Sequence, residues 1–435
     1  MSRVLTGVVE AFWSSPRPDR LGALTRNVEA ITLVAVELSV EAAKAVQIRL
    51  FSRAEAPWTS SQRAERHGYS RSVKSIETTN VTTKLRDQVI TITGGTGSFG
   101  NTMARYALEQ GCREVRIFSR DEAKQDSQRH DFAGEPVHFY LGDVRDASSL
   151  DSAFQGTDLI FHAAALKQVP SCEFFPMQAI RTNIDGSANV LERASQHDVR
   201  SVVCLSTDKA VYPINAMGMT KALMEKLVQA WARANPASEM VASVVRYGNV
   251  MYSRGSVLPL FIRCILQGRP LPVTEPSMTR FLMPLRDAVS LVEFALVNAR
   301  SGEVFIRKAP ASTIGDLASA VIELFEAKNS IDVIGFRHGE KLYETLATRE
   351  ELQRSDDFDD YYRVSMDARD LDYSGFVEEG QKGDGLGEGY HSHNTIRLDR
   401  ESIKALLCSL PQIREDLKQV LGEKRASAIA TIYAS

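Results

Sequence analysis

An α/β fold with a doubly wound parallel sheet is predicted by two features of the sequence. The first is the run Val89–Thr93, which has the period and β-branching of a buried strand and breaks into glycines at Gly94. A helical pattern follows over 101–110 and ends at Gly111. The second feature is that similar strand-like runs recur between helical segments, at 114–120, 137–141, 159–162 and 201–205. Because parallel strands need long crossover connections, this alternation indicates a parallel sheet.

Glycines connect the first strand to the first helix with the spacing G-x-x-G-x-x-G. Gly94 permits a tight turn, Gly97 lets the backbone approach a pyrophosphate, and Gly100 lets the helix and strand pack closely. The free N–H groups and the dipole of a helix N-terminus favour anions. The turn is therefore predicted to bind a dinucleotide in a Rossmann-like fold, through Gly94, Thr96, Gly97, Ser98, Phe99 and Gly100.

The composition excludes several classes of function. With 435 residues and a net charge of −3, the chain is long enough for a large core but has no basic field for nucleic acid. The five cysteines are scattered without C-x-x-C spacing, which favours neither a metal site nor a disulfide framework. We expect a cytoplasmic protein that binds no nucleic acid and no metal.

Residues 1 to 85 differ in character from the rest of the chain. Their apolar stretch, 30–51, is interrupted by Glu37, Glu41 and Lys44, so it is too charged to span a membrane. It could instead form an amphipathic helix, whereas a signal peptide would need its apolar run nearer the N-terminus. We expect this segment to be a poorly ordered extension, or the result of a start codon assigned too far upstream.

The second strand-like run ends where the adenosine ribose of a dinucleotide would lie. An NAD site places a carboxylate there, whereas this chain has the Ser119 hydroxyl and the cations Arg120 and Lys124, which suit a 2′-phosphate. NADP is therefore the predicted cofactor. NAD is the alternative, because Asp121 and Glu122 follow at once and could pair with those cations.

The glycine spacing resembles that of the extended short-chain dehydrogenase/reductase superfamily. In that superfamily Asp143 would hydrogen-bond the adenine edge, small residues would let the cofactor lie against the backbone, and Asn183 would be architectural. The resemblance implies further cofactor contacts from Asp143, Val144, Ala163, Ala164, Ala165, Lys167, Lys221, Tyr247, Asn249 and Val250.

The segment after the run 201–205 is predicted to carry the chemistry, because catalytic groups gather at the carboxyl ends of parallel strands. It contains S-T-D-K, which ends in Asp208 and Lys209, and continues into an amphipathic helix with Lys221. In dehydrogenases of the superfamily, a tyrosine four residues before the lysine is the base. Here that position is Met217, which cannot carry a proton.

In combination, S-T-D-K, M-x-x-x-K and the downstream R-Y-G-N-V at 246–250 closely resemble the CapD-like polysaccharide-biosynthesis proteins. Within that family the similarity is to UDP-N-acetylglucosamine 4,6-dehydratases of the branch that also inverts C5. The resemblance runs from about residue 84 to about residue 410. It implies an NADP-binding Rossmann domain with the catalytic residues over 86–250, a smaller nucleotide-sugar-binding lobe over 251–365 with strands that return to the core, and a C-terminal extension over 366–435.

The same resemblance implies a UDP-sugar site, for which UDP-N-acetylglucosamine is the expected substrate. The segment 337–344 (R-H-G-E-K-L-Y-E) would close over the UDP; alternatively its charges are the solvated face of a helix, with Lys341 between Glu340 and Glu344. His391 and His393 lack accompanying ligands for a metal, so we expect a structural or oligomer contact there. The implied substrate-binding residues are Lys167, Asn249, Arg254, Ser256, Val257, Thr279, Arg280, Arg337 and Glu340.

A 4,6-dehydratase would need a base at the C4 hydroxyl, a base at C5 and an acid at the C6 hydroxyl. We assign Asp208 to the C6 hydroxyl and Lys209 to C5, whereas Lys221 would bind ribose hydroxyls and stabilise the C4 alkoxide. The C4 base stays open between Lys221, Tyr212 and a water. The implied catalytic residues and positions are Thr207, Asp208, Lys209, Tyr212, Met217 and Lys221.

Two other functions stay open. A 4-epimerase acting on UDP-glucose or UDP-N-acetylglucosamine also recycles its cofactor but needs no acid at C6. A non-catalytic NADP-sensing protein is suggested by Met217 and opposed by the retained Lys221. For any of these we expect a homo-oligomer, from a dimer to a hexamer.

Overall fold

The computed structural model describes residues 85–253, 255–367 and 387–433, which belong to one compact unit that runs from residue 76 to residue 435. The expected amphipathic helix within 30–51 and Arg254 lie outside the described residues. In the part of the chain that is described, no helix is both long and apolar enough to cross a membrane.

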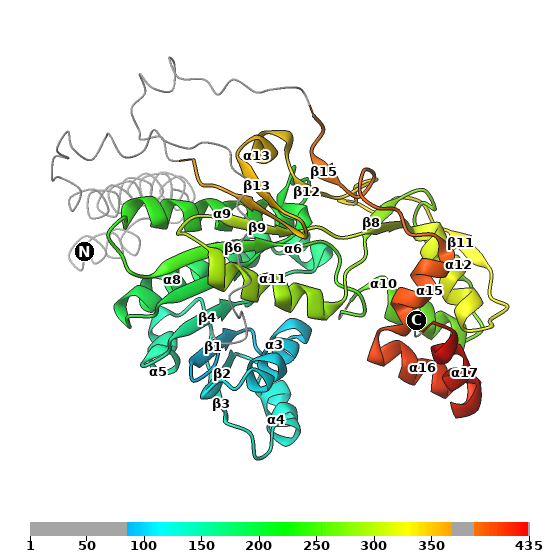
Figure 1. Cartoon of the computed structure of the whole chain (residues 1–435), viewed down its shortest axis with the longest axis horizontal. Coiled ribbons are helices and arrows are strands. Elements are labelled where there is room, and N and C mark those ends of the chain that lie inside the picture. Colours follow the sequence, from blue (N-terminus) through cyan, green and yellow to red (C-terminus); the bar gives the residue numbers. More distant parts are fainter. Residues whose placement is uncertain (1–84, 254, 368–386, 434–435) are drawn as a thin grey trace, which may run out of the picture. The chain divides into compact units, whose positions relative to one another are not determined.

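A nine-stranded sheet forms the centre of the unit, in the order β13-β14-β9-β6-β5-β4-β1-β2-β3 (Figure 1). The strands from β3 to β9 in this order pair in parallel. Their bounds are β1 Val89–Thr93, β2 Glu114–Ser119, β3 Val137–Leu141, β4 Leu159–His162, β5 Ser201–Leu205, β6 Val241–Arg246 and β9 Val304–Arg307. The predicted doubly wound α/β fold is confirmed, and every residue of the mostly apolar strands β1, β4 and β5 is buried, as expected for central strands of a parallel sheet.

The sheet is mixed rather than purely parallel. A hairpin of β13, Ser355–Phe358, and β14, Tyr361–Val364, adds to β9 in the antiparallel direction. The resemblance implied strands within 251–365 that return to the core, but the residue pattern did not single out this hairpin, because its polar sequence lacks the apolar run of the buried strands.

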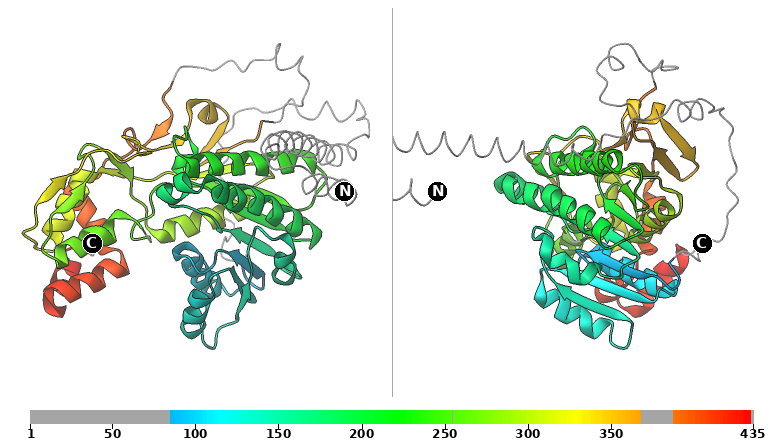
Figure 2. Two further views of the ribbon diagram at one scale, coloured as in Figure 1. Left: turned by 180° about the vertical axis from the view of Figure 1, so that it is seen from behind. Right: turned by 90° about the vertical axis from the view of Figure 1, so that its left-hand side faces the viewer.

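Helices cover both faces of the sheet, as Figure 2 shows from two further directions. One face packs against α3 and α11, and the other against α8 and α9, in two separate apolar clusters. The helices of this part are α3 Ser98–Glu109, α4 Glu122–Asp131, η5 Ala147–Leu150, α5 Asp151–Phe154, α6 Val169–Phe174, α7 Pro176–Ile180, η6 Arg181–Asp185, α8 Gly186–Gln196, η7 Asp208–Ala210, α9 Ala216–Ala234 and α11 Leu285–Asn298.

A smaller group of elements has an apolar core of its own, built mainly on α10, α12 and the C-terminal helices. The Thr313 hydroxyl caps α12 by accepting a hydrogen bond from the Asp316 N–H, which is why the helix begins there. The elements of this group are α10 Val257–Leu266, β7 Leu271–Val273, β8 Thr279–Phe281, β10 Ala311–Thr313, α12 Ile314–Leu324, β11 Ile331–Val333, α15 Arg400–Cys408, α16 Pro411–Leu421 and α17 Glu423–Ile432.

Three short elements connect this group with the central sheet. Strand β12, Thr345–Ala347, pairs in the antiparallel direction with β15, Tyr390–His391, and α13, Arg349–Gln353, follows β12 with a complete capping box. Strand β12 also contacts η7, which lies in the loop after β5. The C-terminal segment that contains β15 is therefore connected to this loop through the β12–β15 pair.

Candidate active site

The carboxyl ends of β1, β4, β5 and β6 lie at one edge of the parallel sheet, where ligands of such folds bind. The glycine turn follows β1, the alanine loop follows β4, the S-T-D-K turn follows β5, and Tyr247–Val250 follows β6. All the predicted catalytic and cofactor-binding segments that are described therefore start from this edge or from β2 and β3 beside it.

The glycine turn is packed as tightly as its spacing predicts. Gly94 has φ +70°, and a Cβ there would lie 2.8 Å from the Ala164 backbone nitrogen. A Cβ on Gly100 would lie 2.5 Å from Gly95 Cα, so the first turn of α3 packs directly on the loop. A Cβ on Gly97, by contrast, meets only the Gly94 carbonyl oxygen, at 3.3 Å. Because no side chain fills the space beside Gly97, the turn leaves room for the pyrophosphate of a dinucleotide at the start of α3.

The cations predicted to bind a 2′-phosphate have partners within the protein. Lys124 pairs with Asp121, and Arg120 lies 3.5 Å from Asp143. Burial opposes ionisation of Asp143, but hydrogen bonds from Arg145 hold its pKa below the ordinary value. The Asp143 carboxylate thus already accepts from Arg145 within the protein, and its contact with an adenine edge stays a prediction.

Beside these cations, the Ser119 hydroxyl lies 2.8 Å from that of Thr96, which links the end of β2 to the glycine turn. Both hydroxyls stand at the predicted ribose position, and no carboxylate occupies residue 119.

The loop after β4 is anchored by a buried polar network. His162 shares hydrogen bonds with Thr93 and Ser187, and burial lowers the pKa of its imidazole to about 3, so the ring is neutral. Asn183 bonds both backbone groups of Leu166, which confirms its architectural role. The alanines of this loop are half-buried and Lys167 is exposed, whereas Val144, which follows β3, is buried.

The S-T-D-K turn brings an acid and a base together at the end of β5. The Asp208 carboxylate is fully buried and accepts hydrogen bonds from the Thr207 hydroxyl at 2.8 Å and from the Lys209 ammonium at 3.0 Å. Its second oxygen, Oδ2, is buried without a hydrogen-bond partner among the described residues. Since buried carboxylate oxygens are normally bonded, this oxygen is available to a ligand.

Lys209 contacts a second carboxylate that the sequence reasoning did not select. Glu344 is 2% exposed, and its Oε1 lies 3.3 Å from the Lys209 Nζ. Burial alone would lower the pKa of Lys209, but the carboxylates of Asp208 and Glu344 outweigh it and raise the pKa. Lys209 is therefore an ammonium in this structure.

The interpretation of residues 337–344 as a solvated helix face is wrong. This segment forms turns and bends, and the side chains of Lys341 and Glu344 are 14% and 3% exposed. Lys341 donates to the Val211 carbonyl at 2.6 Å, and burial lowers the pKa of its ammonium. Lys341 and Glu344, whose spacing suggested a helix face, instead bring two largely buried charges to the site.

Lys221 is also buried, behind the acid–base turn. Its ammonium donates to the Leu205 carbonyl at 2.7 Å and lies 3.5 Å from the Met224 sulfur. Burial lowers the pKa of Lys221 to about 8, so a substantial fraction is neutral near physiological pH. Such a lysine can accept a proton.

Two predicted catalytic positions do not meet this site. Tyr212 is 57% exposed and lies in a turn with φ 46°. Met217 is 5% exposed and packs in a small apolar cluster with Cys172 and Ala179. Met217 is therefore a core residue. Its thioether side chain fills apolar volume in this cluster and is not placed as a proton donor.

Replacing Met217 with Leu is expected to leave turnover within about twofold of wild type, because the exchange conserves apolar volume. Met217→Tyr, which restores the superfamily residue, overpacks the cluster and is expected to cost about 1–3 kcal/mol of stability. Thermal unfolding and steady-state turnover of both variants check this. Faster turnover by the tyrosine variant would contradict the placement of this side chain in the core.

Gly218 sets the distance between α9 and the acid–base turn. A Cβ at this position would lie 2.1 Å from the Lys209 carbonyl oxygen, which is backbone and cannot turn aside. Gly218→Ala is expected to displace Lys209 and to lower kcat by about 10²-fold, as a misplacement of roughly 1 Å can. Gly387→Ala is the matched control, since no atom lies within 4 Å of its Cβ position. Equal kcat in the two variants would show that Lys209 tolerates displacement.

The loop after β6 combines a structural cation with pocket residues. Arg246 is buried in ion pairs with Glu225 and Glu351, which tie β6 to α9 and α13. Tyr247 stacks on Phe99 at 6.4 Å between ring centroids, and Asn249 Oδ1 is buried without a partner among the described residues. The predicted cofactor contacts of this loop thus reach from the glycine turn toward the smaller lobe.

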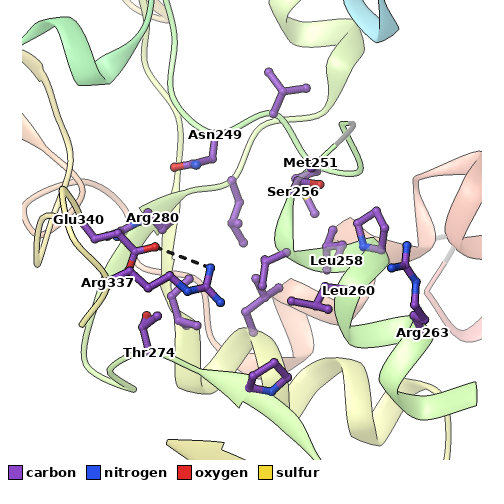
Figure 3. A pocket seen from close by; sticks show the side chains of 18 residues that line it. Asn249, Met251, Ser256, Leu258, Leu260, Arg263, Thr274, Arg280, Arg337 and Glu340 are labelled. Atoms are coloured by element: carbon purple, nitrogen blue, oxygen red, sulfur yellow. Dashed lines mark ion pairs between the residues drawn. The ribbon is translucent and has the colours of Figure 1, made fainter. Parts of the chain in front are cut away.

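A cavity of about 390 Å³ opens between the loop after β6, α10, α12 and the 337–340 loop. Figure 3 shows Arg280, Arg337 and Glu340 together on one side of it and Arg263 on the other, with leucines between them. Guanidinium groups with apolar surface suit a diphosphate joined to a planar base. The predicted substrate residues that line it are Asn249, Ser256, Val257, Arg280, Arg337 and Glu340, together with Val250, predicted for the cofactor.

The cavity also holds unpaired polar atoms. Besides Asn249 Oδ1, the buried Ser256 Oγ and Glu340 Oε2 have no hydrogen-bond partner within the described residues. Buried polar atoms without partners favour a polar ligand.

Thr279 does not line the cavity, contrary to the prediction. Its side chain is 1% exposed, and its hydroxyl lies 2.7 Å from the Ser392 hydroxyl on the opposite side of β8 from Arg280. Alternation along a strand explains this, because neighbouring residues point to opposite faces. The two histidines beside Ser392 contact the ring of Tyr343, with centroid distances of 4.8 Å for His391 and 4.7 Å for His393.

The parallel sheet, its glycine turn and the acid–base turn at the same edge define a class, the extended short-chain dehydrogenases/reductases. Together with the arginine-lined cavity, they characterise an enzyme that modifies nucleotide sugars.

Comparison with known proteins identifies the family. Residues 90–366 match the family described as "Polysaccharide biosynthesis protein", and residues 367–414 match the one described as "Polysaccharide biosynthesis protein C-terminal". The chain therefore belongs to the CapD-like polysaccharide-biosynthesis enzymes, which confirms the resemblance of its motifs.

Individual relatives agree with this assignment. A protein named UDP-glucose 4-epimerase from Rickettsia conorii is 54% identical over 336 residues, which cover 76% of this chain and 98% of the relative. The solved structure of Pen from Bacillus thuringiensis is 33% identical with a TM-score of 0.68, covering 75% of this chain and 99% of that one. The dTDP-glucose 4,6-dehydratase DesIV from Streptomyces venezuelae shares the fold at 23% identity, with a TM-score of 0.53 and coverage of 58% and 86%.

Proposed function

We propose that this enzyme is a UDP-N-acetylglucosamine 4,6-dehydratase that also inverts C5, and that its product is a precursor of the N-acetyl-L-fucosamine type for capsule or O-antigen polysaccharide. The observation that carries the proposal is the buried Asp208–Lys209 pair at the carboxyl end of β5, joined by a hydrogen bond of 3.0 Å. Elimination of water needs an acid and a base that act on neighbouring carbons, and one such pair supplies both.

The pair is suited to this task because one hydrogen bond joins its two groups. Although burial opposes it, the carboxylates of Asp208 and Glu344 raise the pKa of Lys209, so its ammonium holds the proton at rest. Transfer of that proton along the hydrogen bond gives a neutral amine and a carboxylic acid. The amine then takes the C5 proton while the acid protonates the departing C6 hydroxyl, which leaves as water. The pair returns to ammonium and carboxylate, so its protons balance over the elimination.

C5 inversion needs a second proton transfer. Once C4 is a ketone, the C5 proton is acidic, and Lys209 is the residue we assign to its removal. Return of a proton to the opposite face, from solvent water, inverts that carbon.

NADP is the proposed cofactor, held by the glycine turn, by Ser119, Arg120 and Lys124, and by Tyr247. The tight approach of Gly94 to Ala164 and the absence of a carboxylate at residue 119 support this choice. NAD is the alternative, because Asp121 and Asp143 already engage the two cations. A nicotinamide cofactor bound there would supply reversible hydride exchange with C4 and C6, which would keep the overall reaction redox-neutral.

We assign the C4 base to Lys221 rather than to Tyr212. Lys221 is buried behind the turn with a pKa of about 8, whereas Tyr212 is largely exposed. A lysine that is partly neutral at working pH can take the C4 hydroxyl proton directly or through a water.

A UDP-sugar 4-epimerase is the second candidate. Relatives at 53–54% identity carry the name UDP-glucose 4-epimerase, and such a reaction would also recycle a nicotinamide cofactor. A 4-epimerase reaction has no step in which an acid protonates the C6 hydroxyl. The buried Asp208–Lys209 pair therefore favours the dehydratase.

Incubation with UDP-N-acetylglucosamine and catalytic NADP⁺, followed by mass spectrometry, tests the proposal. A product lighter by one water supports the dehydratase. A product of unchanged mass with the galacto configuration would establish the epimerase, and UDP-glucose in a parallel reaction tests which sugar is preferred.

The homo-oligomer stays a prediction. Large apolar side chains are exposed on α6, α7 and α9, which contact one another, and at the junction of α6 and α7. Exposed apolar patches commonly mark interfaces. These side chains are Phe174, Phe175, Met177, Met219 and Leu223.

A further inference from the structure

Glu344 joins the two parts of the site. Its Oε1 lies 3.3 Å from the Lys209 ammonium of the acid–base turn and 3.9 Å from the guanidinium of Arg280, which lines the cavity. Its Oε2 lies 3.9 Å from the Lys341 ammonium and has no hydrogen-bond partner among the described residues. One carboxylate therefore faces three cations that come from η7, β8 and the loop before β12.

A serine of the C-terminal segment holds Glu344 in this place. Ser392 is fully buried, and its hydroxyl accepts the Glu344 N–H at 3.0 Å while its own N–H donates to the Glu344 carbonyl at 2.8 Å. The same hydroxyl donates to the Thr279 carbonyl at 3.2 Å. Ser392 thus fixes the backbone of Glu344 and that of β8, one residue before Arg280.

We propose that Glu344 is a positioning residue that holds the Lys209 ammonium between two carboxylates, and that Ser392 clamps it there. This role rests on the proposed function only in so far as Lys209 is the acid–base residue. It gives the C-terminal segment, through Ser392, a task at the reacting centre.

The charges around Lys209 make the role measurable. Asp208 on η7 and Glu344 raise the pKa of Lys209, whereas Arg280 on β8 lowers it; Lys341 is a further cation beside Glu344. Removing the Glu344 charge leaves Lys209 with one carboxylate partner while the neighbouring cations remain. An opposite charge at this range shifts a pKa by about one to three units.

The test is trace acetylation of lysines in the full-length protein at a series of pH values, read by peptide mass spectrometry. In Glu344→Gln, the labelling midpoint of Lys209 is expected to fall by at least about one pH unit. Glu344→Asp keeps the charge and should retain part of the wild-type midpoint. Glu388→Gln is the matched control, because Glu388 is 78% exposed and pairs with His391 in the same segment.

Ser392→Ala should move the Lys209 midpoint in the same direction by a smaller amount, because the clamp is loosened while the charge remains. In turnover assays both Glu344→Gln and Ser392→Ala should lower kcat by about tenfold or more with KM nearly unchanged. Restoration by Glu344→Asp separates a positioning role from loss of folding.

An unchanged Lys209 midpoint in Glu344→Gln would overturn the proposal, and an unchanged midpoint in Ser392→Ala would overturn the clamp. The labelling needs no substrate, so it is independent of the sugar reaction. If UDP-N-acetylglucosamine gives no product while the midpoint still shifts, the proposed function fails and the role of Glu344 stands.

Discussion

Asp208→Asn and Lys209→Met are each expected to lower kcat by about 10²–10⁴-fold with little change in KM, because each removes one partner of the proton transfer at C5 and C6. The double variant should be about as slow as either single variant, since groups that act as a unit are not additive. Steady-state kinetics of the three proteins with UDP-N-acetylglucosamine measure this.

A matched Asp–Lys pair is available as the control for these substitutions. Lys308 and Asp357 form an ion pair of 2.6 Å beside the edge hairpin of the sheet, with side chains 24% and 58% exposed. Lys308→Met and Asp357→Asn make the same chemical changes away from the site, so turnover should stay within about twofold, as expected for surface pairs. Turnover of Lys209→Met at the level of these controls would contradict the assigned role.

The second large effect concerns Lys221, whose ammonium must lose its proton before it can act as the C4 base. Burial lowers its pKa to about 8, so the neutral fraction grows as pH rises through that value. We expect kcat/KM to fall about tenfold per pH unit below the apparent pKa. Lys221→Arg keeps the positive charge at all accessible pH values and should lower kcat by about 10²–10⁴-fold.

Tyr212→Phe separates the alternatives for the C4 base. If Lys221 is the base, this variant keeps both the turnover and the acidic limb of the wild-type pH profile. A flat profile across about pH 8 in the wild type, or a large loss in Tyr212→Phe, would instead remove Lys221 from this role.

Much of the fold follows from local sequence. The strands β1, β4 and β5 are buried on both faces, and their apolar runs therefore stand out from the helices around them. The glycine turn was predictable because only glycine suits φ +70° at Gly94 and the close approach of Gly100. The edge hairpin was not, because its strands depend on pairing with β9 rather than on their own polar sequence.

The acid–base turn was located from the motif that follows β5, but its second carboxylate was not. Glu344 and Lys341 have the spacing of an exposed helix face, and only their burial distinguishes them. That burial depends on Ser392, 48 residues further along the chain, through contacts that no local pattern encodes. The prediction that Thr279 lines the cavity failed for a similar reason. The pairing of β8 with β10 determines which residues of β8 face the cavity.

The most direct test of the central claim is proton NMR of the product formed from UDP-N-acetylglucosamine in deuterated water. If Asp208 and Lys209 carry out elimination across C5 and C6, the product has a C6 methyl group and deuterium at C5, and ring couplings that report inversion. A galacto-configured product with an intact C6 hydroxyl and no deuterium at C5 would contradict the account and leave the pair without the roles assigned to it.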